Sequence, residues 1–98
     1  MAKTVIATVK AAAGQEEKLA SMIRELAQLV RKDAGTAQFD VYRDRDDKGA
    51  FQFLEVYDDE AAFQLHITAD HVQKFNEALK EIAEGGASKV YFVDPFCY

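Results

Sequence analysis

Apolar residues change their period along the chain, and these changes divide it into strands and helices. Thr4–Val9 is rich in β-branched residues, which is typical of a β-strand. From Gln15 the apolar residues recur at spacings of three and four, as on one face of a helix: Leu19, Met22, Ile23, Leu26 and Val30. Arg31 and Lys32 would lie in the last turn of this helix, where the helix dipole favours positive charge, and Gly35 would stop it.

A β-hairpin is predicted in the middle of the sequence. Strands of about Thr36–Arg43 and Ala50–Tyr57 flank Asp46–Gly49, whose Asp, Lys and Gly residues are typical of a turn. The two strands should therefore pair with each other in antiparallel orientation.

Two helical segments are predicted after the hairpin. We expect Asp58 to cap a short helix that runs through Phe63 and Ile67. Thr68 or Asp70 then starts a second helix, whose apolar residues share one face: Val72, Phe75, Leu79 and Ile82. The sequence thus predicts a helix that is broken into two parts.

The last predicted strand, Lys89–Val93, follows Gly85 and Gly86 and ends before Pro95. The order of elements is βαββαβ, which predicts an α+β, ferredoxin-like antiparallel sheet with its helices on one face. At 98 residues the chain should form a single domain over residues 1–98.

Both faces of the predicted sheet are apolar. Phe51, Phe53 and Tyr57 should point to one side, and Leu54 and Val56 to the other. Two helices can cover only one face, and an uncovered face of Phe and Tyr would be a large exposed patch. We therefore expect a homodimer in which a second copy covers this face; the alternative is that the aromatic side chains are tolerated at the surface.

Charge and composition narrow the class of partner. The formal net charge of −5 opposes binding to nucleic acid, where Lys and Arg neutralise phosphates. The sequence has no apolar run of the ~18 residues that a membrane span needs. The start passes directly into a strand pattern, and the lone Cys97 cannot form an internal disulfide, so we expect a cytoplasmic protein. Cys97 is either inert or bridges two subunits, and the tail at 96–98 is expected to extend across the partner.

The chain lacks a phosphate-binding loop, a dinucleotide fingerprint and a Cys-x-x-Cys pair, so we expect no cofactor. His66 and His71 are five residues apart, whereas metal ligands on one helical face need a spacing of three or four and a third ligand. We therefore expect no metal. Each histidine is instead a candidate general acid or base, or a residue that caps the break between the helices.

Asp40 and Glu55 are carboxylates within predicted strands, where Asp and Glu are unfavourable unless they face solvent or a polar pocket. By alternation Glu55 shares a face with Phe53 and Tyr57, and these apolar neighbours would disfavour its charged form, as in a tuned acid or base. The alternative is that Glu55 pairs with Arg43 across the hairpin.

Side chains with a flat ring could bind an aromatic substrate. The candidates are Phe53, Tyr42, Tyr57 and Tyr91, although aromatic residues in strands are more often part of the core. Arg43 is the candidate that would bind an anionic group.

The sequence resembles the antibiotic biosynthesis monooxygenase family almost from end to end. The similar segments are Val5–Val9, Gly14–Glu17, Gln38–Asp44, Phe53–Ala62 and His66–Val72. This resemblance implies a dimeric α/β barrel with a pocket in each subunit between sheet and helices. It also implies an oxygenase that uses neither metal nor flavin: a base removes a proton from a small phenol or quinol, and the resulting anion reduces O2.

Other activities of the family are alternatives. The haem-degrading members carry an Asn and a Trp where this sequence has Ala7 and Tyr57, so haem degradation is disfavoured. Phe39–Val41 together with the two histidines is similar to the isomerase of phosphorylated autoinducer-2, although only Lys3, Lys10 and Arg43 near the strands could bind a phosphate. A non-catalytic module that binds a small molecule is the third possibility.

Of the candidate bases, we favour His66 over His71. His71 would lie in the first turn of a helix, where a polar residue often serves only the cap. His66 follows Leu65 on a short helix that must lie against the sheet, so its ring should reach Glu55 and Tyr57. A neighbouring carboxylate would then hold its pKa near neutral pH, as suits a general base.

Overall fold

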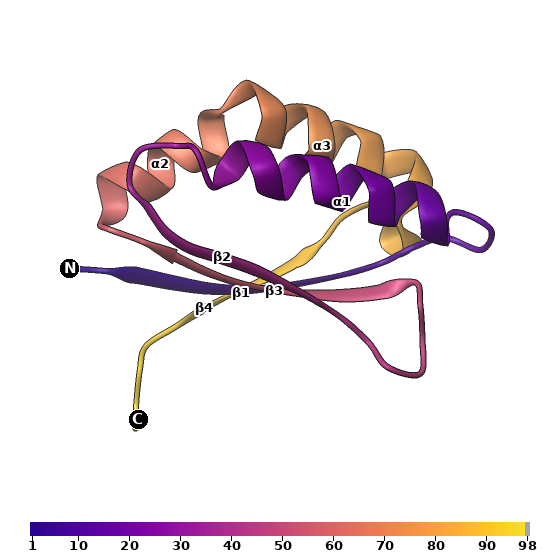
Figure 1. Cartoon of the computed structure of the whole chain (residues 1–98), viewed down its shortest axis with the longest axis horizontal. Helices are drawn as coiled ribbons and strands as arrows, with labels where there is room; N and C mark the ends of the chain where they lie inside the picture. Colours follow the sequence, from indigo (N-terminus) through magenta and orange to yellow (C-terminus); the bar gives the residue numbers. More distant parts are fainter. Residues whose placement is uncertain (98) are drawn as a thin grey trace.

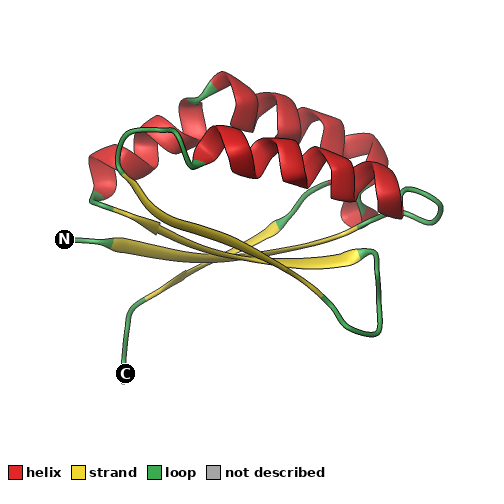
Figure 2. Ribbon diagram, in the orientation of Figure 1, coloured by secondary structure: helices red, strands yellow, loops and turns green. Residues whose placement is uncertain are grey.

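In the computed structural model, which describes residues 1–97, four antiparallel strands form one layer and the helices form the other (Figures 1 and 2). The elements in chain order are β1 (Lys3–Lys10), α1 (Glu16–Val30), β2 (Thr36–Arg43), β3 (Ala50–Tyr57), α2 (Glu60–Thr68), α3 (Asp70–Ile82), a 3₁₀ turn (Glu84–Gly86) and β4 (Lys89–Val93). The sheet has the order β2-β3-β1-β4. The predicted α+β, ferredoxin-like fold is thus confirmed, including the break between α2 and α3.

Two predicted helix ends were displaced. The helix α1 ends at Val30, so Arg31 is its C-cap and not a member of its last turn. Asp59, and not Asp58, is the N-cap of α2, and its carboxylate accepts a hydrogen bond of 2.8 Å from the backbone N–H of Ala62. An N-cap side chain reaches the amide three residues further on, which for Asp59 is the amide of Ala62. Asp58 lies one residue earlier, and its backbone N–H donates to the carbonyl of Gly35.

Gly35 allows the loop after α1 to pass close to α2. Its φ is +86°, a conformation that residues with a Cβ rarely adopt. A Cβ at this position would lie 2.5 Å from the Cβ of Ala62. This glycine therefore fixes the position of the loop that carries Asp33, next to the start of α3.

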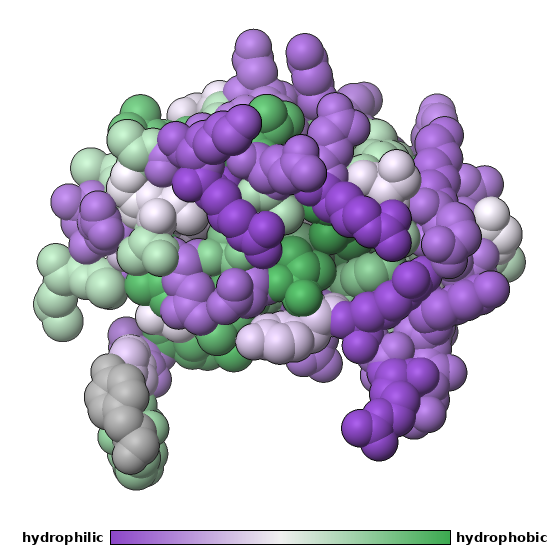
Figure 3. Space-filling model, viewed as in Figure 1, coloured by the Kyte–Doolittle hydropathy of each residue, from purple (hydrophilic) through white to green (hydrophobic). Residues whose placement is uncertain are grey.

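The core lies between the sheet and the helices. The helix-facing side of the sheet contributes Val5, Ala7, Val9, Phe39, Phe51 and Phe53. Leu19, Leu26, Val30, Phe75 and Leu79 of α1 and α3 pack against them. Figure 3 shows hydrophilic side chains over the helical layer and hydrophobic ones at the surface in the band between helices and sheet. Within residues 1–97, no helix has the length and apolar character needed to cross a bilayer.

The other face of the sheet carries aliphatic residues in its middle, together with exposed tyrosines and polar residues. Its residues pair across the strands, with Ile6 opposite both Leu54 and Tyr91, and with Val56 and Val93 opposite Thr4. We expected an uncovered face of Phe and Tyr; instead Phe51, Phe53 and Tyr57 of β3 turn toward the helices and are buried. The reason is the register, which places Phe51 and Phe53 beside the buried Val9 and Ala7 of β1, and Tyr57 follows on the same face of β3.

Candidate active site

A buried carboxyl group lies at the centre of the sheet, under α2. Glu55 of β3 is only 7% exposed and pairs in register with Val5 on one side and Phe39 on the other. The hydroxyl of Tyr57 donates a hydrogen bond of 2.5 Å to Oε1 of Glu55. This bond is possible because residues two apart in a strand point to the same face. Tyr57 therefore fixes the orientation of the Glu55 carboxyl.

His66 of α2 lies over this carboxyl. Its Nε2 is 3.6 Å from Oε1 of Glu55, and its ring centroid is 4.7 Å from that of Tyr57. The residue is 9% exposed, and its Nδ1 has no hydrogen-bond partner within residues 1–97. The N-cap at Asp59 sets the start of α2, so that Ala62, Phe63 and His66 fall on its buried side.

The Glu55–His66 pair lines a cavity of about 100 Å³ between the sheet and the helices. Aromatic and aliphatic side chains form most of its wall, among them Phe53 and Phe63. The cavity extends to Asn76 of α3 and to Ser88 and Val90 near β4, of which Asn76 and Val90 are exposed. Glu55 and His66 thus lie at the buried end of the cavity, and the exposed lining residues lie near the β4 edge of the sheet.

Burial controls the protonation of this pair. It raises the pKa of the Glu55 carboxyl, and the hydrogen bond from Tyr57 opposes that rise. Burial also lowers the pKa of the His66 imidazole to about 4, while the negative charge of Asp33 acts in the opposite direction. We expected a carboxylate to hold the pKa of His66 near neutral pH, and this was wrong because desolvation outweighs the neighbouring charge. The pair is thus an uncharged imidazole beside a carboxyl group whose pKa is raised by burial.

Tyr57 remains a hydrogen-bond donor in this arrangement. Burial and the proximity of Glu55 raise the pKa of its hydroxyl well above the ordinary value. A tyrosine that stays protonated can only donate to a neighbouring carboxylate or share its proton with it. Its role is therefore to position Glu55.

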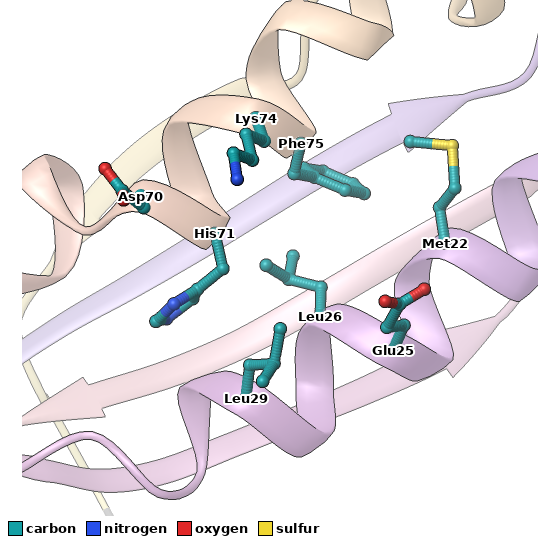
Figure 4. A pocket seen from close by; sticks show the side chains of 8 residues that line it. All are labelled: Met22, Glu25, Leu26, Leu29, Asp70, His71, Lys74 and Phe75. Atoms are coloured by element: carbon teal, nitrogen blue, oxygen red, sulfur yellow. The ribbon is translucent and has the colours of Figure 1, made fainter.

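His71 lies in the first turn of α3, as predicted, but in different surroundings. Its Nε2 is 2.7 Å from Oδ2 of Asp33 in the loop that follows α1. It lines a groove of about 370 Å³ between α1 and α3, together with Leu29 and Lys74 (Figure 4). The two histidines therefore do not meet in one cavity.

Four other predicted residues lie away from the cavity. Asp40, Tyr42 and Tyr91 are on the open face of the sheet, where Asp40 accepts a hydrogen bond from Gln38 and the tyrosines are 56% and 50% exposed. Arg43 faces the helices, but it binds Glu17 at 2.9 Å at the far end of the hairpin. Their functional roles stay predictions, and the alternative of a Glu55–Arg43 pair does not occur, because Arg43 is in register with Phe51.

Phe53 and Tyr57 belong to the site region, Phe53 as part of the cavity wall and Tyr57 as the partner of Glu55. Sequence reasoning missed the contributions of Asn76 and Ser88. Asn76 directly follows Phe75 of the apolar stripe on α3, which is the signal that could have placed it near the edge of the core. No three His, Cys, Asp or Glu side chains in the described part of the chain are grouped so that they could hold a metal ion.

Comparisons with known proteins agree with this fold. The family model of antibiotic biosynthesis monooxygenases matches residues 3–78. Over 76 residues the chain is 32% identical to "Putative monooxygenase YcnE" of Bacillus subtilis (strain 168). The matched stretch covers 78% of this chain and 80% of that protein. The chain thus belongs to a class of α+β proteins in which a four-stranded antiparallel sheet is covered by helices on one face. The chain is a member of the antibiotic biosynthesis monooxygenase family.

Solved structures show the same arrangement of elements. PA3566 from Pseudomonas aeruginosa superimposes with a TM-score of 0.89 at 29% identity, over 98% of this chain and 95% of that chain. Rv0793 from Mycobacterium tuberculosis also gives a TM-score of 0.89, over 100% of this chain and 98% of that chain. Its identity is 18%, so this second likeness concerns the fold alone.

Proposed function

We propose that this protein is a monooxygenase that oxidises a small phenol or quinol with O2, and that His66 is its general base. The observation that carries the proposal is a buried, uncharged histidine with a free Nδ1 in the wall of an aromatic-lined cavity. An uncharged imidazole has a lone pair that can accept a proton, whereas an imidazolium has none. The membership of the monooxygenase family supports the same reaction class.

The proposed roles follow from the positions of the atoms. With Nε2 of His66 directed toward Glu55, Nδ1 is the nitrogen that can accept the proton of a substrate hydroxyl. The positive charge that then develops on the imidazole lies 3.6 Å from Oε1 of Glu55, which would stabilise it. Tyr57 holds Glu55 in place for this purpose.

The overall reaction needs no reductant besides the substrate. Loss of the hydroxyl proton makes the ring electron-rich, and the phenolate supplies the electrons that reduce O2. For a phenol the products are a quinone and water: one oxygen atom enters the ring, the other leaves as water, and the ring loses two hydrogen atoms. His66 receives the first proton and returns it when the water forms.

The sugar-phosphate alternative has less support from the site. The cavity wall includes no Lys or Arg among the described residues. Lys3 instead binds Glu60, Lys10 binds Asp47 and Arg43 binds Glu17, all outside the cavity. A phosphate group in the cavity would therefore be buried without a charged partner, which is costly.

The reaction is tested by oxygen uptake of the purified protein, treated with a chelator, with a panel of phenols and quinols. We expect uptake with at least one compound and, with ¹⁸O2, one labelled atom in the product and one in water. Ordered protein that consumes no oxygen across the panel would contradict the proposal. Tight binding of a compound without turnover would favour the non-catalytic binding module.

We also propose that two copies pair through the open face of the sheet. Ile6, Leu54 and Tyr91 lie side by side in the middle of this face, and Ile6 and Tyr91 are exposed in the single chain. A patch of this kind usually marks an interface. Sedimentation should give about twice the chain mass of 11.0 kDa.

A charge in the centre of the patch should prevent this pairing. We expect Leu54→Lys to sediment as a monomer, because the charge would be buried without a partner in the dimer. Ser21→Lys on the exposed side of α1 is the matched control and should remain a dimer. A monomeric parent protein, or a dimeric Leu54→Lys, would contradict this arrangement.

A further inference from the structure

The cavity and the groove between α1 and α3 share a wall. Leu26 of α1 and Phe75 of α3 line both the cavity of about 100 Å³ that contains His66 and the groove of about 370 Å³ that contains His71. Figure 4 shows the two side chains, one from each helix, on the groove side. Leu26 and Phe75 therefore form a common wall between the cavity that contains the reactive pair and a larger hollow.

The wall is part of the core and not a mobile lid. Leu26 and Phe75 are buried and belong to the same apolar cluster as Leu19 and Leu79. Side chains that are packed in this way keep their rotamers, and a smaller residue leaves an opening that its neighbours fill only in part. On the side toward the groove, these two residues thus bound the volume beside His66.

The volume beside His66 limits the size of a ligand. A cavity of about 150 Å³ is large enough for one benzene ring. The cavity beside His66 measures about 100 Å³, and its exposed lining residues lie at the end near Asn76 and Val90. A single ring can thus reach His66 when part of it occupies this end, whereas fused rings would collide with Leu26 and Phe75.

We propose that Leu26 and Phe75 determine substrate size, restricting the site to single-ring phenols or quinols and excluding fused-ring ones. The phenolic class rests on the proposed function, whereas the size limit rests on the shared wall. Removing part of the wall joins the cavity to the groove, so the same His66 should then accept a two-ring substrate.

The test compares the binding of phenol and 1-naphthol, measured by NMR titration so that no turnover is needed. The variants are Leu26→Ala, which opens the wall, and Leu19→Ala, a control from the same helix that lines neither hollow. Circular dichroism verifies that each is folded. If Leu26→Ala does not fold, Phe75→Leu opens the wall from the other side, with Leu79→Ala as its control.

We expect the parent protein to bind phenol at least tenfold more tightly than 1-naphthol. Leu26→Ala should raise the relative affinity for 1-naphthol at least tenfold, and Leu19→Ala should keep the parental ratio. Four results would each overturn the proposal. The parent could bind phenol and 1-naphthol equally tightly or bind neither, Leu26→Ala could keep the parental affinity ratio, or Leu19→Ala could change that ratio as much as Leu26→Ala does. The expected ranking in a protein that consumes no oxygen would instead overturn the proposed function and leave the size limit intact.

Discussion

His66 and His71 are five residues apart in the sequence but lie in opposite environments. His66 faces the sheet and is almost fully buried, with its Nε2 next to the carboxyl group of Glu55 and its Nδ1 without a hydrogen-bond partner among the described residues. His71 faces the loop after α1, is partly exposed and is bound to Asp33 at 2.7 Å. The break between α2 and α3 causes this difference, because it turns the second helix so that the two rings point to different hollows. The comparison teaches that a histidine can take part in proton transfer where one of its ring nitrogens is buried and has no hydrogen-bond partner.

The largest expected effect comes from replacing each histidine in turn. His66→Gln keeps a polar side chain of similar length but removes the base, so kcat/KM should fall by ~100-fold or more, the usual contribution of a positioned general base. His71→Gln removes only the bond to Asp33, so its kcat/KM should stay within ~3-fold of the parent. Oxygen uptake measures both. Equal losses of kcat/KM in the two variants would contradict the claim that only His66 acts as the base.

The second effect is a pH dependence of stability that arises from His66. A histidine in the unfolded chain titrates near its ordinary pKa of 6.5, whereas burial lowers the pKa of His66 to about 4. Between these values the unfolded state binds more protons than the folded state, so the free energy of unfolding falls as the pH falls. From pH 7 to pH 5 the loss due to His66 should be ~2 kcal/mol.

This loss is measured by urea unfolding of the parent and of His66→Gln at both pH values. Glu55 acts in the opposite direction: burial raises its pKa, so its contribution to stability is lost as the pH rises. Both proteins contain Glu55, so the difference between them isolates the contribution of His66. A parent protein that loses no more stability than His66→Gln on acidification would show that His66 is not buried in its neutral form.

Glu55→Gln should have a smaller effect on catalysis than His66→Gln. The amide keeps an acceptor for the Tyr57 hydroxyl but cannot carry the negative charge that balances a developing imidazolium. We expect kcat to fall ~10-fold, with the fold retained, because Glu55 acts through His66. Tyr57→Phe is the matched variant, which removes only the positioning bond and should lower kcat less. A Glu55→Gln protein with parental kcat would remove the carboxyl from the mechanism.

The smallest effect concerns the other histidine. Asp33→Asn weakens the bond to His71, which is partly exposed, so the free energy of unfolding should fall by only ~1 kcal/mol. Thermal unfolding measures this change, and oxygen uptake should remain close to the parental rate. A large loss of activity in Asp33→Asn would show that the Asp33–His71 pair also contributes to the reaction, and it would contradict the distinction between the two histidines.

Local patterns predicted the parts of the site that depend on the period of one element. Strand alternation placed Glu55 beside Phe53 and Tyr57, and the short amphipathic helix placed His66 against the sheet. The same patterns could not tell which face of β2 the helices cover. That choice depends on the pairing with β3, including the irregularity between Thr36 and Gln38, and it turned Asp40 and Tyr42 to the open face.

Contacts between distant segments were beyond sequence reasoning. Asp33 and His71 are 38 residues apart, and they meet because Gly35 lets the loop approach α2. The low pKa of His66 was also missed, since it depends on how completely the surrounding aromatic side chains exclude water. Periodicity indicates which side of an element is buried, but it does not measure the depth of burial.

The central claim, that His66 is an uncharged base beside Glu55, is tested most directly by ¹⁵N NMR of the histidine side chains. The account predicts that His66 is neutral from pH 7 down to about pH 5, with a pKa of about 4 and its proton on Nε2, the nitrogen that faces Glu55. A His66 that titrates near 6.5 would contradict the burial of a neutral imidazole. A His66 that carries its proton on Nδ1 would contradict its proposed role, since Nδ1 could then not accept the proton of the substrate.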